Sequence, residues 1–184
     1  MENSFPNAEW IDKAEIASRQ LAEAVRLFFE QRDPIVIHTI IASAHQILFD
    51  LGKERGIHSA LKHPPSQEKK EVRDYFSAIN YAYNFFKHAD TDGSIKINMA
   101  PLMRFTSDFI MDVAWMLQQL NGKLPLEGKV YWAWFASKYK EEFPDDGEIG
   151  RMKNLNLGEL DFKDICAFLR IGGFLQSTSE KDSR

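Results

Sequence analysis

Residues 34–55 carry apolar side chains on nearly every face of the helix that their sequence predicts. Asp33-Pro34 is a strong start for this helix, because Asp can accept hydrogen bonds from the free N–H groups of the first turn and Pro suits the first helical position. Gly56 is a suitable end. A helix that is apolar nearly all round belongs at the centre of a protein or in an oligomer interface.

Amphipathic patterns predict five further helices. The first has an apolar stripe that begins at Trp10, and the last begins with the capping-box spacing of Asn156 and Glu159 and ends at Gly172-Gly173. In chain order, the six predicted helices cover about residues 7–31, 34–55, 67–88, 101–120, 129–142 and 157–170.

The order of these segments predicts an all-α fold, a four-to-six-helix bundle with a C-terminal helical extension. We expect residues 1–122 to form the main bundle and residues 123–176 a helical pair packed on it. Residues 177–184 are polar and charged, and we expect them to be a disordered tail.

Charge and cysteine content exclude several kinds of protein. A net charge of −4 argues against a domain whose whole surface binds nucleic-acid backbone. The single cysteine, Cys166, rules out a disulfide within the chain and cysteine-rich zinc sites. The chain also has no Glu-x-x-His and no Gly-rich phosphate-binding motif, so we expect no metal and no cofactor. No run approaches the ~18 apolar residues of a membrane span. We therefore expect a cytoplasmic protein that does not enter a membrane.

The third predicted helix has two stripes of different character. Its apolar stripe consists of Val72, Phe76, Ile79, Tyr83 and Phe86. Its polar stripe has the same spacing, offset from the first, and consists of Arg73, Ser77, Asn80, Asn84 and His88. The polar stripe is either a site or a solvated face.

Two histidines lie on the apolar second helix. His38 and His45 are seven residues apart, hence on one face but about 10.5 Å apart along the axis, too far to share a metal ion. We expect them to be hydrogen-bonded in a core or an interface, with partners from the polar stripe of the third helix. His38, His45 and Asn80 are therefore candidate binding residues in a polar cleft between the second and third helices.

Three other patterns have plainer interpretations. Asp108 and Asp112 are four residues apart, which is typical of a solvated helix face. We expect Trp132 and Trp134 to pack in the core rather than stack on a ligand. The segment that begins at His88 spaces acidic residues like a calcium loop but lacks the Glu needed at the twelfth position, so we expect a turn.

Asn84-Phe-Phe-Lys-His88, at a helix end, resembles the site region of the HEPN superfamily (higher eukaryotes and prokaryotes nucleotide-binding). HEPN domains are helical bundles, often dimeric, and many are metal-independent ribonucleases of prokaryotic defence and toxin systems. Their signature is Arg, four to six residues, then His, whereas Arg73 lies fifteen positions before His88. The resemblance implies that His88 would activate the ribose 2′-OH or protonate the leaving oxygen, with Lys87 and Arg73 stabilising phosphate charge and Asn84 orienting the site.

The stretches Ile37-His-Thr, Ala44-His-Gln-Ile-Leu and Asn84-Phe-Phe-Lys-His-Ala-Asp also resemble a group of short bacterial proteins. That resemblance implies no mechanism. The function that we expect is a non-catalytic binding or interaction module, a homodimer whose partner is a protein, RNA or a small ligand. The alternative is a HEPN-like ribonuclease.

Overall fold

The computed structural model describes residues 10–65, 67–88 and 93–181, and within these ranges no residue lies in a strand. The fold is therefore all-α, as predicted. Its helices are α1 (Lys13–Phe29), α2 (Pro34–Gly52), α3 (Lys69–Lys87), α4 (Leu102–Asn121), α5 (Leu126–Lys138), α6 (Gly147–Lys153) and α7 (Phe162–Lys181), with short 3₁₀ turns at Lys140–Glu142 and Leu157–Glu159.

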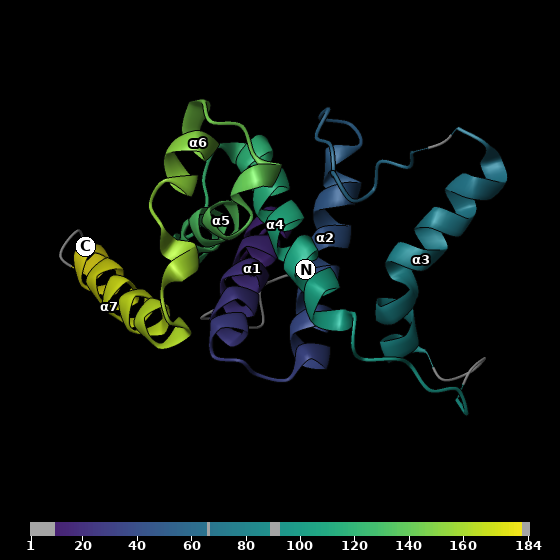
Figure 1. Ribbon diagram of the computed structural model, residues 1–184, viewed down its shortest axis with the longest axis horizontal. Helices are drawn as coiled ribbons and strands as arrows, with labels where there is room; N and C mark the ends of the chain where they lie inside the picture. The colour runs from purple at the N-terminus through teal and green to yellow at the C-terminus, as the bar shows by residue number, and fades with distance from the viewer. Residues whose placement is uncertain (1–9, 66, 89–92, 182–184) are drawn as a thin grey trace, which may run out of the picture.

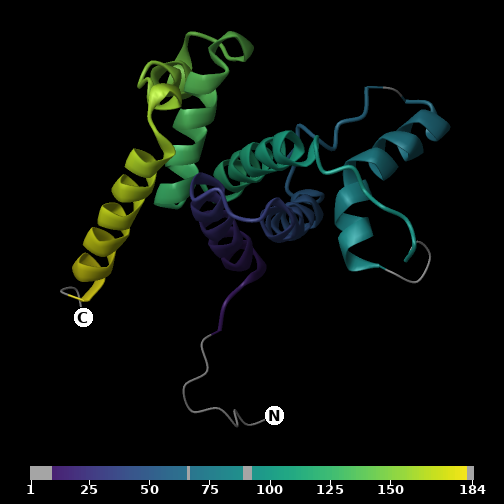
Figure 2. The same cartoon turned by 60° about the horizontal axis from the view of Figure 1, so that its bottom comes forward.

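The core lies where α1, α2, α4 and α5 pack together, and α2 packs against both α1 and α4 (Figures 1 and 2). Ile37, Ile41 and Leu48 of α2 are almost completely buried there. Of the two positions expected for the apolar second helix, the structure shows the central one for this face, while Ile35 and Val36 near its start are 40% and 48% exposed. Within the described residues α2 is also the one helix long and apolar enough to span a bilayer, a criterion that a core helix of a soluble protein meets equally.

Aromatic side chains join the C-terminal part of the chain to α1. Tyr131 and Trp134 of α5 meet Phe28 edge-on, with ring centroids 5.3 and 5.4 Å apart, and Phe162 of α7 packs against Phe29 at 5.1 Å. The core is continuous across the expected boundary at residue 122. Trp132 and Trp134 are both buried, which confirms that they are packing residues.

Helix α3 lies at the edge of this core, on the side opposite α7 (Figures 1 and 2). Of its 19 residues only Ile79 is buried, and it joins the core together with the partly buried Tyr75 and Tyr83. The connections on both sides of α3, residues 53–68 and 88–101, are long. The third helix is thus a peripheral member of the bundle, with most of its surface uncovered.

Several predicted helix ends are wrong. Helix α1 starts at Lys13, because the Asp12 carboxylate accepts a hydrogen bond from the Glu15 amide (2.8 Å), and Trp10 is 81% exposed instead of opening the apolar stripe. Helix α2 ends at Gly52, four residues before Gly56, where the backbone turns with φ +66°.

The C-terminal region also differs from the predicted helical pair, because α6 lies between α5 and α7. Asn156 adopts φ +54° and makes no side-chain cap, so only a 3₁₀ turn follows it. Helix α7 continues through Gly172 to Lys181. Gly172 does not end the helix but lies so close to Leu126 that a Cβ there would collide with it. The expected tail at 177–184 is helical to Lys181, and residues 182–184 lie outside the described chain.

One smaller prediction falls partly outside the described residues. The turn expected after His88, in place of a calcium loop, includes residues 89–92, which the structure does not describe.

Candidate functional site

A buried polar cluster joins α2, α4 and the segment after α2. At its centre the Asp112 carboxylate of α4 accepts hydrogen bonds from His45 Nε2 of α2 (2.7 Å) and from Ser59 Oγ (2.6 Å). All three residues are at most 6% exposed. We call His45, Ser59 and Asp112 the Asp112 anchor.

The Asp112 anchor also holds the backbone of the segment between α2 and α3. Asp112 accepts hydrogen bonds from the amides of Ala60 (2.8 Å) and Leu61 (3.4 Å), and the Ser59 hydroxyl oxygen accepts from the Lys62 amide (2.8 Å). Four donors around one buried carboxylate compensate for its lost hydration. The anchor therefore fixes where the chain leaves the core on its way to α3.

The interpretation of Asp112 as part of a solvated face is wrong, because its side chain points into the core. A signal for this burial is present in the sequence. Asp112 occupies the vacant place in the apolar stripe formed by Phe105, Phe109, Met116 and Leu120. Ser59 is the residue that sequence reasoning missed entirely, since it lies in an irregular segment with no periodic pattern.

The proton arrangement shows what the Asp112 anchor can do chemically. Burial lowers the pKa of His45, against the opposing effect of Asp112, so the imidazole is neutral and donates its Nε2 hydrogen to the carboxylate. The Ser59 hydroxyl donates to the same oxygen, Oδ2 of Asp112. In a Ser-His-Asp triad the serine donates to a free imidazole nitrogen instead. The cluster contains triad residue types, but they are bonded as a structural anchor.

Lys62 and its neighbours extend the cluster toward the surface. Lys62 Nζ donates to Gln46 Oε1 (2.6 Å) and lies 4.4 Å from the centroid of the Phe49 ring. Burial lowers the pKa of Lys62, with Asp50 acting in the opposite direction. These contacts give the segment after α2 a second attachment.

His38 has a separate partner on α4. The Thr106 hydroxyl donates to Leu102 O (2.7 Å), so the 3.1 Å contact between His38 Nδ1 and Thr106 Oγ1 is a hydrogen bond donated by the imidazole. Burial, helped by the nearby His45, lowers the pKa of His38 to about 4. The His38 Nε2 and His45 Nδ1 atoms are buried without a hydrogen-bond partner among the described residues.

The expected polar cleft between α2 and α3 is a wrong prediction. The partners of both histidines come from α4 and from Ser59, not from the polar stripe of α3. Asn80 instead donates to Phe76 O within its own helix (2.9 Å). His38, His45 and Asn80 therefore do not line one site.

The residues singled out by the HEPN resemblance divide into two groups on α3. Asn84, Lys87 and His88 lie together and exposed at its C-terminal end, where His88 is the capping residue and its amide donates to Asn84 O (3.0 Å). Lys87 Nζ lies 4.4 Å from the centroid of the Tyr83 ring. Arg73 is fifteen residues earlier, about 22 Å away along the helix axis. One chain thus does not bring Arg73 to His88.

An apolar groove of about 350 Å³ lies beside the Asp112 anchor. Ala60 and Leu61 of the segment after α2 line it, as does Trp115 of α4, which is 40% exposed. Burial raises the pKa of Asp108 in its lining, although Arg104, 3.3 Å away, acts against this.

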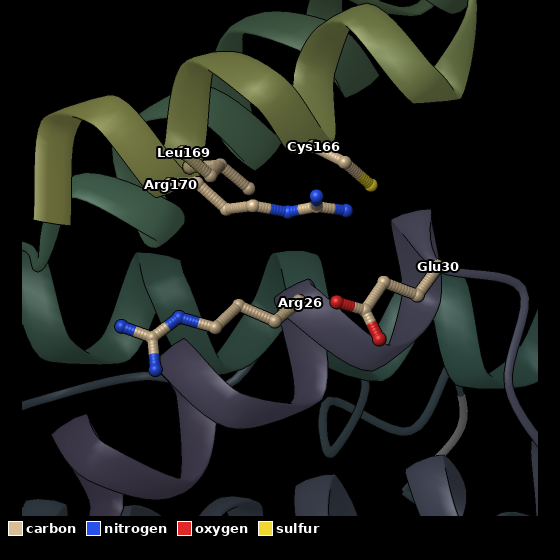
Figure 3. A pocket seen from close by; sticks show the side chains of 5 residues that line it. All are labelled: Arg26, Glu30, Cys166, Leu169 and Arg170. Atoms are coloured by element: carbon tan, nitrogen blue, oxygen red, sulfur yellow. The ribbon is translucent and has the colours of Figure 1, made fainter.

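A second cavity, of about 310 Å³, lies between α1 and α7 (Figure 3). Glu30 faces it from α1, while Cys166 and Arg170 face it from α7. Burial raises the pKa of the Cys166 thiol, which keeps it protonated and poorly nucleophilic. Cys166 is a buried free thiol.

Within the part of the chain that the structure describes, no three His, Cys, Asp or Glu side chains converge on a point where a metal ion would fit. Comparison of the chain with models of protein families, with curated proteins and with solved structures found no match. The resemblance to HEPN domains therefore stays an expectation from the residues themselves.

Proposed function

We propose that the protein is a non-catalytic interaction module that presents α3 to a protein partner. The observation that carries this proposal is the low burial of α3, in which one residue of 19, Ile79, is buried. Four aromatic residues on its inner side are only partly covered, namely Tyr75, Phe76, Tyr83 and Phe86. A helix whose aromatic side chains are only partly covered by its own chain is typical of a binding element whose apolar face a partner covers.

The outer face of α3 has the composition of an interface. Arg73 and Asn84 are exposed, and Tyr81 is 49% exposed. Tyrosine and arginine are enriched among the residues that contribute most to protein–protein affinity. An RNA surface of this length would require a denser row of basic side chains than α3 carries.

The charge of α3 indicates the kind of partner. Lys69, Lys70, Arg73 and Lys87 against Glu71 and Asp74 make four positive and two negative charges, a net +2 on a chain of net −4. Opposite charge on the partner would speed encounter and select against other partners. We therefore infer an acidic protein surface that contains an apolar patch.

The Asp112 anchor supports this function by holding α3 in position. The Tyr75 hydroxyl donates to Leu61 O (2.7 Å), one residue beyond Ala60, whose amide is bound by Asp112. At the other end of α3, Phe86 meets the His38 ring edge-on at 6.1 Å. The Asp112 anchor and His38 thus hold α3 through one contact near each of its ends.

A display experiment tests the proposal. Random peptides are selected against the immobilised wild-type protein, and the affinity of the enriched peptides is then measured for Tyr81→Ala and for Glu71→Ala, an exposed control on the same helix. We expect acidic peptides with aromatic or aliphatic residues, which bind Tyr81→Ala at least about tenfold more weakly and Glu71→Ala as they bind the wild type. Peptides that bind both variants equally would place recognition elsewhere and refute the role of α3.

A ribonuclease is the second candidate, because one specific observation favours it. His88 is exposed beside Lys87 and Asn84, so a proton-transfer group and a cation lie together on the surface. The test incubates single-stranded RNA with the wild type, with His88→Ala and with His63→Ala, an exposed histidine that serves as the control. Cleavage that is lost only in His88→Ala would favour the ribonuclease over the interaction module. Intact RNA, or equal cleavage by all three proteins, would reject it.

A further inference from the structure

A second apolar groove, of about 440 Å³, lies on the opposite side of the molecule from α3. Its walls come from α5, α7 and the segment that joins α6 to α7. Among its lining residues Val130, Ala133 and Ile165 are buried, whereas Leu155 and Leu160 are exposed. We call it the C-terminal groove.

The rim of the C-terminal groove is unusually apolar for a surface. Leu155 is 60% exposed, Leu160 44% and Phe168 56%, and all three line the groove. Ile171, three residues after Phe168 on α7, is 63% exposed. A contiguous apolar surface of this kind marks an interaction site.

Two opposite charges also line the C-terminal groove. Lys129 of α5 and Asp164 of α7 both border it, and within the described chain neither side chain has an ion-pair partner. A two-fold symmetric interface places the same patch against itself, so it must contain complementary features. This groove is lined by a positive and a negative group, and by the half-exposed ring of Phe168 beside the apolar hollow.

We propose that the C-terminal groove is the surface through which two copies of this chain form a two-fold symmetric dimer. Phe168 of each copy enters the groove of the other, and Lys129 of each copy faces Asp164 of the other. The four exposed apolar side chains form the centre of the contact and the charges its rim, the usual division in protein interfaces.

The position of the groove agrees with the function proposed for α3 but does not depend on it. Helices α3 and α7 lie at opposite ends of the molecule in both views (Figures 1 and 2). A dimer formed at the α7 end therefore leaves both copies of α3 exposed. Such a dimer could engage two partners, or two parts of one partner, at once.

The mass of the full chain in solution tests the proposal, measured by light scattering after size exclusion and by sedimentation velocity. The wild type should have twice the chain mass of 21.3 kDa. Phe168→Glu should have the mass of one chain, with an unchanged helical circular dichroism spectrum. The control is Ile95→Glu, because Ile95 is also 56% exposed but lies outside the groove, and this variant should stay dimeric.

Exchanging the charges of Lys129 and Asp164 tests whether these two residues face each other across the dimer. Lys129→Asp and Asp164→Lys should each raise the dimer dissociation constant about tenfold, because each places like charges opposite one another. The double variant carries both exchanges in every copy and should recover most of the wild-type affinity. Two results overturn the proposal. One is a wild type that is monomeric at 100 µM, whether or not an apolar small molecule is bound to it. The other is a dimer whose dissociation constant Phe168→Glu does not change. None of these outcomes bears on peptide binding by α3, so the two proposals can fail separately.

Discussion

Replacing Asp112 with Ala should be among the most destabilising substitutions in this chain. The change leaves two buried donors, His45 Nε2 and Ser59 Oγ, without their acceptor, together with the part-buried amides of Ala60 and Leu61. An unsatisfied buried donor costs about 1–3 kcal/mol. The two buried donors carry most of the loss, so we expect the free energy of unfolding to fall by about 4 kcal/mol.

Urea unfolding monitored by circular dichroism measures this loss, and Asp108→Ala is the matched control. Asp108 lies one turn earlier on α4, but its side chain is 29% exposed and its partner, Arg104, is 50% exposed. An exposed pair of this kind contributes about 0.5 kcal/mol. If Asp112→Ala were too unstable to study, Asp112→Asn would serve, because the amide keeps one acceptor and should cost about 2 kcal/mol.

Amide hydrogen exchange adds a local measurement. In Asp112→Asn the amide of Ala60 should lose protection more than the amides of α5, because the carboxylate holds the segment after α2 directly. If Asp112→Ala costs no more than Asp108→Ala, the buried carboxylate is not the anchor that its contacts indicate, and the account of how α3 is held in position fails with it.

Three further predictions follow from buried groups and close contacts. The unfolded chain binds a proton at His38 near pH 6.5 and the folded chain only near pH 4, because burial lowers the pKa of His38. The free energy of unfolding of the wild type should therefore fall by about 2 kcal/mol from pH 7 to pH 5. Urea unfolding of His38→Phe should show a smaller fall over the same range. Gly158→Ala should lower the free energy of unfolding by about 1–3 kcal/mol, because a Cβ there lies 2.7 Å from the Lys138 amide nitrogen; an unchanged melting temperature would contradict this. Arg26→Met should cost about 2 kcal/mol in chemical unfolding by leaving the buried Glu127 carboxylate without its cation, and adding Glu127→Gln should recover most of that loss.

The all-α fold and the central position of α2 could be predicted because both follow from local patterns. Apolar residues at helical spacing identify a helix and its buried face whatever packs against it. The all-round apolar character of residues 34–55 leaves few places for that helix except the interior. Helix ends were predicted less well, because they depend on single contacts such as the hydrogen bond from the Glu15 amide to Asp12.

The Asp112 anchor could be predicted only in part. A buried histidine on an apolar helix needs a partner, and that argument identified His45 correctly as a hydrogen-bonded residue. Its partner, Asp112, is 67 residues away in the chain, and Ser59 lies in a segment without periodicity. Local pattern shows which residues need a partner but not which distant residue supplies it.

Helix α3 shows a different limit of sequence reasoning. Its two stripes were read correctly as one apolar face and one polar face. The pattern does not show how much of the apolar face is covered, since coverage depends on the path of the connections at both ends of the helix.

The low burial of α3 has a consequence for how proteins of this kind can change. Its outer residues contribute nothing to the buried core, so substitutions at Arg73, Tyr81 or Asn84 should alter the proposed recognition surface with little effect on the folding of the rest. If that proposal holds, a lineage can acquire a new partner through mutations on this helix without first gaining stability elsewhere. The Asp112 anchor lies outside that surface, so it would give α3 the same orientation in each variant.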